Sequence, residues 1–140
     1  MKKILLSLIV LCGLAYASIA FVEATPQAVE NETYQLIDVR TPSEWEETGV
    51  IKNAHKISVT TSDMKSYNQH FIDDILSANI DPDKPVALIC RSGSRSRKAA
   101  KILEKNGFKY VINLNGGVNS LIYKYSYKLD KNSEKKSDAE

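Results

Sequence analysis

The feature that most constrains the fold is a short apolar run that ends at a cysteine. Val86–Ile89 is continuously apolar, which is typical of a strand covered on both faces of a parallel sheet, and Cys90 follows it directly. A helical pattern then runs over residues 96–106, with Ala99 and Leu103 among the positions expected to face inward. This segment therefore predicts a strand, a loop and a helix, with a thiol at the start of the loop.

Further strand and helix patterns alternate along the chain. Residues 34–39, 54–57 and 110–112 read as strands, and residues 62–78 as an amphipathic helix, with an irregular first half as the alternative because that half is polar. A short helix begins after Thr41, where Pro42 and Glu44 suit a first turn. Residues 21–33 predict only an arm with one helical turn. The alternation predicts a compact α/β domain with a mainly parallel central sheet flanked by helices.

The first 20 residues have the pattern of a targeting segment. Lys2 and Lys3 precede an apolar stretch from Ile4 to Ala20. This pattern predicts a signal peptide over residues 1–20, cleaved after Ala17 or Ala20, and hence an exported, periplasmic protein. A membrane anchor formed by the same stretch is the alternative, because the stretch approaches the length of a spanning helix.

The chain that follows the predicted signal segment carries no net charge. Without Lys2 and Lys3, the 19 basic residues fall to 17, which equals the number of acidic residues. Nothing in this balance points to nucleic acid as a partner. Residues 21–127 are expected to form one domain, and residues 128–140 a charged disordered tail.

Cys90 is the single thiol left once Cys12 is removed with the signal segment. Exported proteins usually carry paired cysteines, so a lone thiol is either an inert core residue or chemically active. Its position before a helix favours the thiolate, and Arg91 and Arg95 add positive charge, while Gly93 permits a tight turn. We expect a nucleophile that must be reachable from solvent, with a buried core cysteine as the alternative.

Residues at three strand ends are expected to meet at one site. In an open parallel sheet, ligands bind beyond the carboxyl ends of the strands. Asp38 and Arg40 close the first predicted strand, Cys90 follows the central one, and Gly116 and Gly117 follow the last. Asp38 and Arg40 are expected to form a structural pair beside the loop. No metal site is predicted, because the two histidines lack metal-ligand spacing.

Three motifs in this order resemble the single-domain rhodanese family of sulfurtransferases. They are Asp38-Val39-Arg40-Thr41-Pro42-Ser43-Glu44-Trp45, Cys90-Arg91-Ser92-Gly93-Ser94-Arg95-Ser96 and Leu114-Asn115-Gly116-Gly117. The resemblance covers residues 34–125 and implies a rhodanese-like compact α/β domain. Val50 stands where the family usually has histidine, and Leu121 where tryptophan is frequent. These departures concern substrate preference and packing.

The resemblance also implies a chemistry. Cys90 would take the sulfane sulfur of a small anionic donor such as thiosulfate and pass it from a persulfide to cyanide or a thiol. Asp38, Arg40, Gly116 and Gly117 would support the site, without a metal or organic cofactor. The groups expected to bind the donor belong to Arg91, Ser92, Gly93, Ser94, Arg95 and Ser96.

Two alternatives remain open at this stage. The first keeps the fold but limits the protein to a non-catalytic sulfur carrier or binding module that serves a protein acceptor. The second is a small cysteine phosphatase or arsenate reductase that uses Cys90. The loop from Cys90 to Arg95 has six residues, whereas phosphatases of similar fold use a loop one residue longer, so the resemblance favours sulfur transfer.

Overall fold

The computed structural model describes residues 18–131. Residues 1–17, which hold most of the predicted signal segment, and residues 132–140 of the predicted tail lie outside the described residues. The elements follow one another in the order β1 (Ser18–Glu23), α1 (Pro26–Val29), β2 (Gln35–Asp38), α2 (Pro42–Thr48), β3 (His55–Lys56), α3 (Phe71–Ser77), β4 (Val86–Ile89), α4 (Ser94–Lys105), β5 (Tyr110–Asn115), α5 (Gly117–Asn119) and the π-helical turn η1 (Ser120–Lys124).

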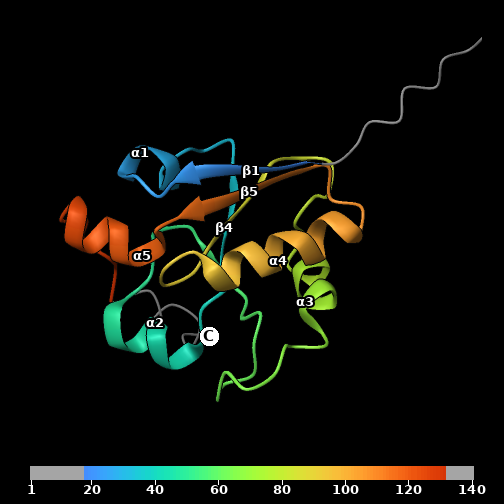
Figure 1. Cartoon of the computed structure of the whole chain (residues 1–140), viewed down its shortest axis with the longest axis horizontal. Coiled ribbons are helices and arrows are strands. Elements are labelled where there is room, and N and C mark those ends of the chain that lie inside the picture. Colours follow the sequence, from blue (N-terminus) through green and yellow to red (C-terminus); the bar gives the residue numbers. More distant parts are fainter. Residues whose placement is uncertain (1–17, 132–140) are drawn as a thin grey trace, which may run out of the picture.

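The five strands form one parallel sheet in the order β1-β5-β4-β2-β3. The central strand β4 is the apolar run of the sequence, and all of its residues are buried. Figure 1 shows α5 beyond the carboxyl ends of β1 and β5, where the arrowheads point. This arrangement confirms the predicted α/β fold with a parallel central sheet.

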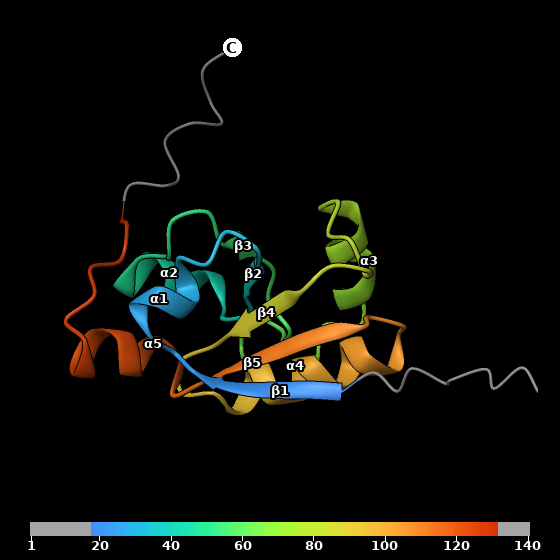
Figure 2. The ribbon, with the colours of Figure 1, turned by 90° about the horizontal axis from the view of Figure 1, so that it is seen from above.

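Two apolar clusters cover the two faces of the sheet. Leu88 faces the cluster formed with α3 and α4, whereas Ala87 and Ile89 face the cluster formed with α1 and α5. Successive residues of β4 thus point to opposite faces, as the pleat of a strand requires. Figure 2 shows the same arrangement from above, with α4 close to β5. A strand buried in this way places Cys90 at the centre of the carboxyl edge of the sheet.

The N-terminal boundary of the domain differs from the prediction. The sequence predicted an arm over residues 21–33, but residues 18–23 form β1, which pairs with β5 from Ser18 opposite Tyr110 to Glu23 opposite Asn115. The predicted helical turn is present as α1. β1 is an edge strand whose residues are exposed or half-buried, and its first half continues the apolar stretch that the sequence assigned to the signal segment, which hid the strand. The domain therefore begins before Phe21, at or before Ser18.

The C-terminal boundary also lies further along the chain than predicted. Residues 128–131 were expected in a disordered tail, but Val50 and Asp130 exchange two main-chain hydrogen bonds of 2.9 and 2.8 Å. Leu129 packs against the cluster on the α1 side of the sheet. Gly49 lies beside this bridge with a positive φ of 88°, and a Cβ there would lie 2.9 Å from the Asp130 carbonyl oxygen. The ordered domain therefore includes Lys131.

Of the helix predicted over residues 62–78, only the second half is present, which confirms the alternative of an irregular first half. Only α3 is helical, and the preceding segment is a turn in which Thr60 bridges Tyr67. Asp63 Oδ1 accepts a hydrogen bond of 3.1 Å from the main-chain N–H of Lys65. Such local side-chain contacts compete with the helical hydrogen bonds, which explains why the polar first half of the segment is not helical.

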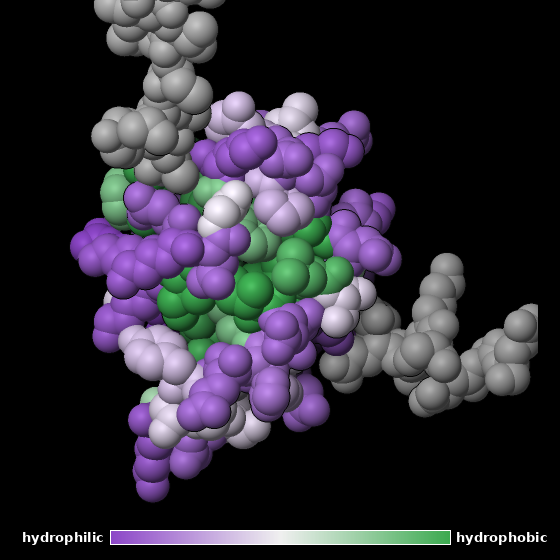
Figure 3. Space-filling model, turned by 90° about the vertical axis from the view of Figure 1, so that its right-hand side faces the viewer, coloured by the Kyte–Doolittle hydropathy of each residue, from purple (hydrophilic) through white to green (hydrophobic). Residues whose placement is uncertain are grey.

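One end of the domain carries exposed apolar surface. Figure 3 shows a group of hydrophobic residues bordered by hydrophilic ones on the side of the molecule where β1 begins and α4 ends. Ile19, Ile72 and Ile102 are among the partly buried residues that pack against the cluster formed with α3 and α4. Within residues 18–131, no helix is long and apolar enough to cross a membrane.

Candidate active site

The loop after β4 directs a hydrogen-bond donor at the sulfur of Cys90. Gly93 has a φ of 106°, a left-handed conformation that suits glycine, and its N–H lies 3.1 Å from the Cys90 Sγ. The Ser96 hydroxyl donates to the Gly93 carbonyl at 3.1 Å and lies 3.4 Å from the same sulfur. The N–H of Gly93 is thus the one donor assigned to the sulfur among the described residues, and an N–H donor of this kind favours negative charge on sulfur.

Gly116 and Gly117 bring the turn after β5 against this loop. The N–H of Val118 donates to the Cys90 carbonyl at 2.9 Å, and the N–H of Asn119 donates to the Arg91 carbonyl at 3.0 Å. A Cβ on Gly117 would lie 2.3 Å from the Cys90 carbonyl oxygen, so a larger residue does not fit here. The third sequence motif thus holds the main chain of the second one in place.

Asp38 and Arg40 form a buried ion pair, as the sequence predicted. Arg40 Nη2 lies 2.7 Å from Asp38 Oδ2, and its Nε lies 3.0 Å from Oδ1. The same guanidinium donates to the Gly49 carbonyl at 2.8 Å and to the Thr48 hydroxyl at 2.6 Å. The pair therefore joins the end of β2 to the end of α2. Its contacts are structural ones.

Arg95 forms an ion pair that the sequence did not predict. It was expected to bind the donor, but its Nη1 and Nη2 lie 2.8 and 2.7 Å from the two carboxylate oxygens of Glu44. Glu44 also closes the capping box of α2 by accepting from the main-chain N–H of Thr41 at 2.9 Å. The first and second motifs are thus joined by a bidentate ion pair, and Arg95 holds the loop against α2.

Glu44 was missed as a site residue, although a signal for its local role was present. Thr41 and Glu44 have the spacing of a capping box, which fixes the carboxylate at the start of a helix. Burial alone raises the pKa of Glu44, but hydrogen bonds from Arg95 and Thr41 outweigh it and lower the pKa to about 2. The hydrogen bond to Glu44 and the charge of its carboxylate in turn raise the pKa of Arg95. The ion pair thus keeps both groups charged at neutral pH and fixes the loop that encloses the sulfur.

Cys90 itself is buried, with no exposed surface. Sulfur chemistry with a dissolved donor therefore requires a local movement of the loop or of the side chains over it. The sequence predicted a thiol reachable from solvent, and the structure contradicts this: the burial agrees with the alternative of an inert core cysteine, whereas the Gly93 N–H directed at the sulfur does not. Of the other loop residues, Ser96 is also buried, while Arg91, Ser92 and Ser94 are exposed.

Two cavities adjoin the loop from opposite sides. A small cavity of about 90 Å³ lies between α2 and α5, and Arg91 lines it together with Glu44 and Tyr123. A larger one of about 420 Å³ is lined by Ser92, Gly93 and Ser94, by Asn115 and Gly116, and by basic residues of α4. The exposed Arg91 is therefore better placed than Arg95 to meet an incoming anion.

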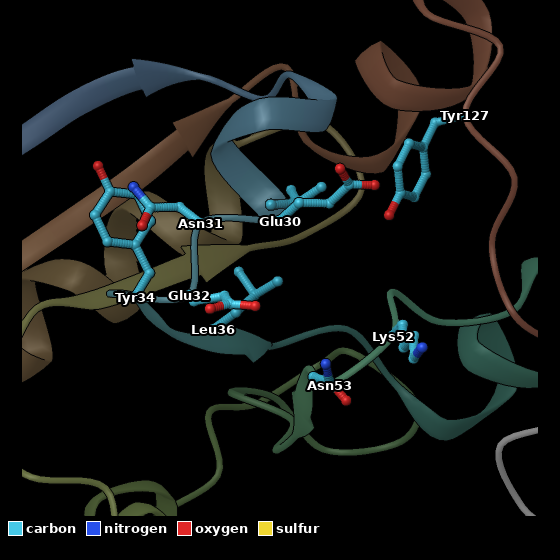
Figure 4. A pocket seen from close by; sticks show the side chains of 9 residues that line it. Glu30, Asn31, Glu32, Tyr34, Leu36, Lys52, Asn53 and Tyr127 are labelled. Atoms are coloured by element: carbon cyan, nitrogen blue, oxygen red, sulfur yellow. The ribbon is translucent and has the colours of Figure 1, made fainter.

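A further cavity of about 460 Å³ lies away from the loop, between the segment after α1, the turn before β3 and Tyr127. Figure 4 shows the Glu30 carboxylate directed towards the Tyr127 hydroxyl in this cavity. Burial and Glu30 together raise the pKa of Tyr127. None of the residues that line this cavity belongs to the three motifs, so it is separate from the candidate active site.

Comparison with known proteins identifies the family. Residues 22–123 match the model of the rhodanese-like domain. A sulfurtransferase of Allochromatium vinosum is 34% identical over 89 residues, covering 64% of this chain and 72% of its own length. The thiosulfate sulfurtransferase GlpE of Pseudomonas syringae is 30% identical over 91 residues, covering 65% and 74%.

A solved structure agrees with these sequence matches. The polysulfide-sulfur transferase homodimer of Wolinella succinogenes is similar with a TM-score of 0.62 and 25% identity, and the match covers 89% of this chain and 88% of that one. The fold, the order of the three motifs and the family match all agree. The chain belongs to the rhodanese-like domain family, which includes named sulfurtransferases.

Proposed function

We propose that this protein is a sulfurtransferase that carries sulfane sulfur on Cys90. The observation that carries the proposal is the main-chain N–H of Gly93, which donates to the Cys90 sulfur at 3.1 Å in a loop that also contains Arg91 and Arg95. The names of the relatives support thiosulfate or a polysulfide as donor, since both contain sulfur bonded to sulfur.

The proposed reaction has two steps that balance. The Cys90 thiolate attacks the outer sulfur of thiosulfate, the S–S bond of the donor breaks, and its electron pair leaves with sulfite. A thiolate or cyanide then attacks the outer sulfur of the persulfide, and Cys90 leaves as thiolate. Main-chain N–H groups of the loop and the exposed Arg91 neutralise the anions of the first step. The covalent intermediate predicts ping-pong kinetics.

Intact mass spectrometry tests this proposal directly. After treatment with thiosulfate, the protein should gain the mass of one sulfur atom, and cyanide or dithiothreitol should remove it. Cys90→Ser should abolish the gain, because no other thiol lies within residues 18–131. A protein that hydrolyses an aryl phosphate and never gains sulfur would instead be a phosphatase.

The burial of Cys90 supports a second candidate, a sulfur carrier that does not turn over small acceptors. A sulfur atom enclosed by its loop is shielded from small donors and small nucleophiles alike until a partner opens the site. In that case thiosulfate alone should add little sulfur to Cys90, and any mass gain that forms should persist in the presence of cyanide. Transfer of the sulfur to cyanide within the time of the assay would instead favour an enzyme that turns over small acceptors.

We also propose that the protein is exported and that its signal segment is cleaved after Ala17. The sequence left cleavage after Ala17 or Ala20 open. Cleavage after Ala20 would remove Ser18, Ile19 and Ala20, three of the six residues of β1 that pair with β5. The same strand disfavours a membrane anchor, because residues 18–20 belong to β1 and only residues 4–17 of the apolar stretch remain. A helix needs about 20 apolar residues to span a bilayer.

The mass of the protein recovered from the periplasm of a bacterium that expresses the full gene tests this proposal. The expected product starts at Ser18. A product starting at Phe21, or a full-length chain that stays in the membrane fraction, would contradict it.

A further inference from the structure

We propose that the exposed face of α4 is a docking surface for an acidic protein that exchanges sulfur with Cys90, an inference that rests on the proposed function. The surface, called here the α4 surface, consists of three basic and three apolar residues. They are Arg97, Lys98, Lys101, Phe21, Met64 and Tyr67.

The basic residues of the α4 surface form a concentration of unneutralised charge. α4 contains five basic residues and one acidic residue. Within residues 18–131, no acidic side chain forms an ion pair with Arg97, Lys98 or Lys101. Elsewhere in the domain, by contrast, Lys109 and Lys124 each pair with a carboxylate. The domain thus leaves these three cations available to a negatively charged partner.

Exposed apolar side chains accompany these cations. Phe21, Met64 and Tyr67 are exposed to 51%, 54% and 46%, and all three lie beside side chains of α4. The Arg97 guanidinium lies 5.4 Å from the centre of the Phe21 ring, and the Lys98 ammonium lies 5.8 Å from the Tyr67 ring. These contacts hold the cations over the rings.

The combination of residues favours a protein over a small anion. Aromatic residues, methionine and arginine are enriched in protein interfaces, whereas the binding of a small anion needs only charge and hydrogen bonds. Lys98 lines both the cavity of about 420 Å³ and a neighbouring one of about 270 Å³, so the surface extends beyond a single small-molecule site.

The α4 surface lies next to the loop that encloses the Cys90 sulfur. Ser92, Gly93 and Ser94 of the Cys90 loop line the same cavity as Arg97, Lys98 and Lys101. Arg95, which bridges the loop to Glu44, also donates to the Met64 sulfur at 3.6 Å. A protein that contacts the α4 surface therefore contacts the loop that encloses Cys90. Opposite charge on the partner would speed its arrival and orient its thiol.

Single-turnover transfer to two synthetic peptides tests the proposal. Each peptide carries one cysteine; one has flanking Asp and Glu residues, and the other has Asn and Gln at the same positions. The protein is loaded with thiosulfate, freed of excess donor and mixed with each peptide or with dithiothreitol, which is uncharged. We expect transfer to the acidic peptide to be about tenfold faster at low salt, with the difference lost at high salt.

Two matched triple variants test whether the basic residues of the α4 surface cause the preference for the acidic peptide. Arg97→Gln with Lys98→Gln and Lys101→Gln should remove the preference for the acidic peptide and leave transfer to dithiothreitol unchanged. The control, Lys52→Gln with Lys84→Gln and Lys128→Gln, removes three positive charges elsewhere and should keep the preference. Equal rates for the two peptides, or a preference that survives in the first variant, would overturn the proposal.

A binding measurement separates this inference from the sulfur chemistry. Calorimetry with a cysteine-free form of the acidic peptide should detect binding to the unmodified protein and at least tenfold weaker binding to the α4 variant. Failure of transfer to dithiothreitol counts against the proposed function. Normal transfer to dithiothreitol without any binding of the acidic peptide counts against the docking surface alone.

Discussion

The carboxylate of Glu44 takes part in two interactions that connect separate parts of the site. It caps α2 through Thr41, and it binds both terminal nitrogens of Arg95 in the loop after Cys90. The ion pair is largely buried, with side-chain exposures of 18% for Arg95 and 13% for Glu44. A partner removed from such a pair leaves the other charge poorly solvated.

Glu44→Gln should therefore lower the free energy of unfolding by about 1–3 kcal/mol, because glutamine keeps the shape but not the charge. Urea unfolding at neutral pH measures the loss. Glu47→Gln, on the exposed face of the same helix, is the matched control and should change stability by less than about 0.5 kcal/mol. Equal losses in the two variants would show that the ion pair contributes nothing specific.

The stability of the protein should depend on pH through the same carboxylate. The pKa of Glu44 in the folded state is about 2, below that of an unfolded glutamate, which is about 4.3. The stabilisation by the Glu44 charge is complete at pH values above the pKa of the unfolded state, and it is lost as the pH falls from about 4.3 towards 2. The difference in unfolding free energy between wild type and Glu44→Gln should shrink over this interval, and a constant difference would contradict the assignment.

At the scale of elements, the site depends on the contact between the turn after β5 and the loop after β4. Two N–H groups of α5 bind the carbonyls of Cys90 and Arg91, and this approach is possible because Gly117 has no side chain. The two segments are far apart in sequence but lie side by side because β4 and β5 are neighbours in the sheet.

Gly117→Ala should displace the loop and destabilise the protein by more than about 2 kcal/mol, since the new Cβ meets the Cys90 carbonyl oxygen at 2.3 Å. Gly107→Ala is the control: it shares a positive φ but has no atom within 4 Å of the new Cβ. The control should cost about 1 kcal/mol from backbone strain alone. Thermal unfolding and the rate of persulfide formation should both separate the two variants.

The inner elements and the nucleophile loop could be predicted from the sequence, but the contacts between motifs could not. β4, α4 and the position of Cys90 follow from periodicity and from a continuous apolar run, which are local signals. The pairing of Arg95 with Glu44 joins residues 51 positions apart, and no local pattern reveals it. The burial of Cys90 likewise results from packing in three dimensions.

At the scale of the whole molecule, both ends of the described chain contribute to the domain. β1 was missed because its apolar first half runs on from the predicted signal segment, and residues 128–131 were missed because their composition is mostly polar. Asp130 nevertheless pairs with Val50 beside the buried Arg40 network.

A chain that ends at Tyr127 should be less stable than one that ends at Lys131, because it loses the two hydrogen bonds of Val50 and the packing of Leu129. Each hydrogen bond contributes about 1 kcal/mol, so the expected loss is about 1–3 kcal/mol. Differential scanning calorimetry of the two chains, each starting at Ser18, measures it. Identical melting temperatures would mean that the segment adds nothing to the fold.

The pairing of β1 with β5 also determines when the sheet can be completed during synthesis. β1 comes from the first described residues, yet its partner strand is residues 110–115. The strands β2, β3 and β4 are therefore all made before the neighbour of β1, so the β1 edge of the sheet is the last part whose partner becomes available.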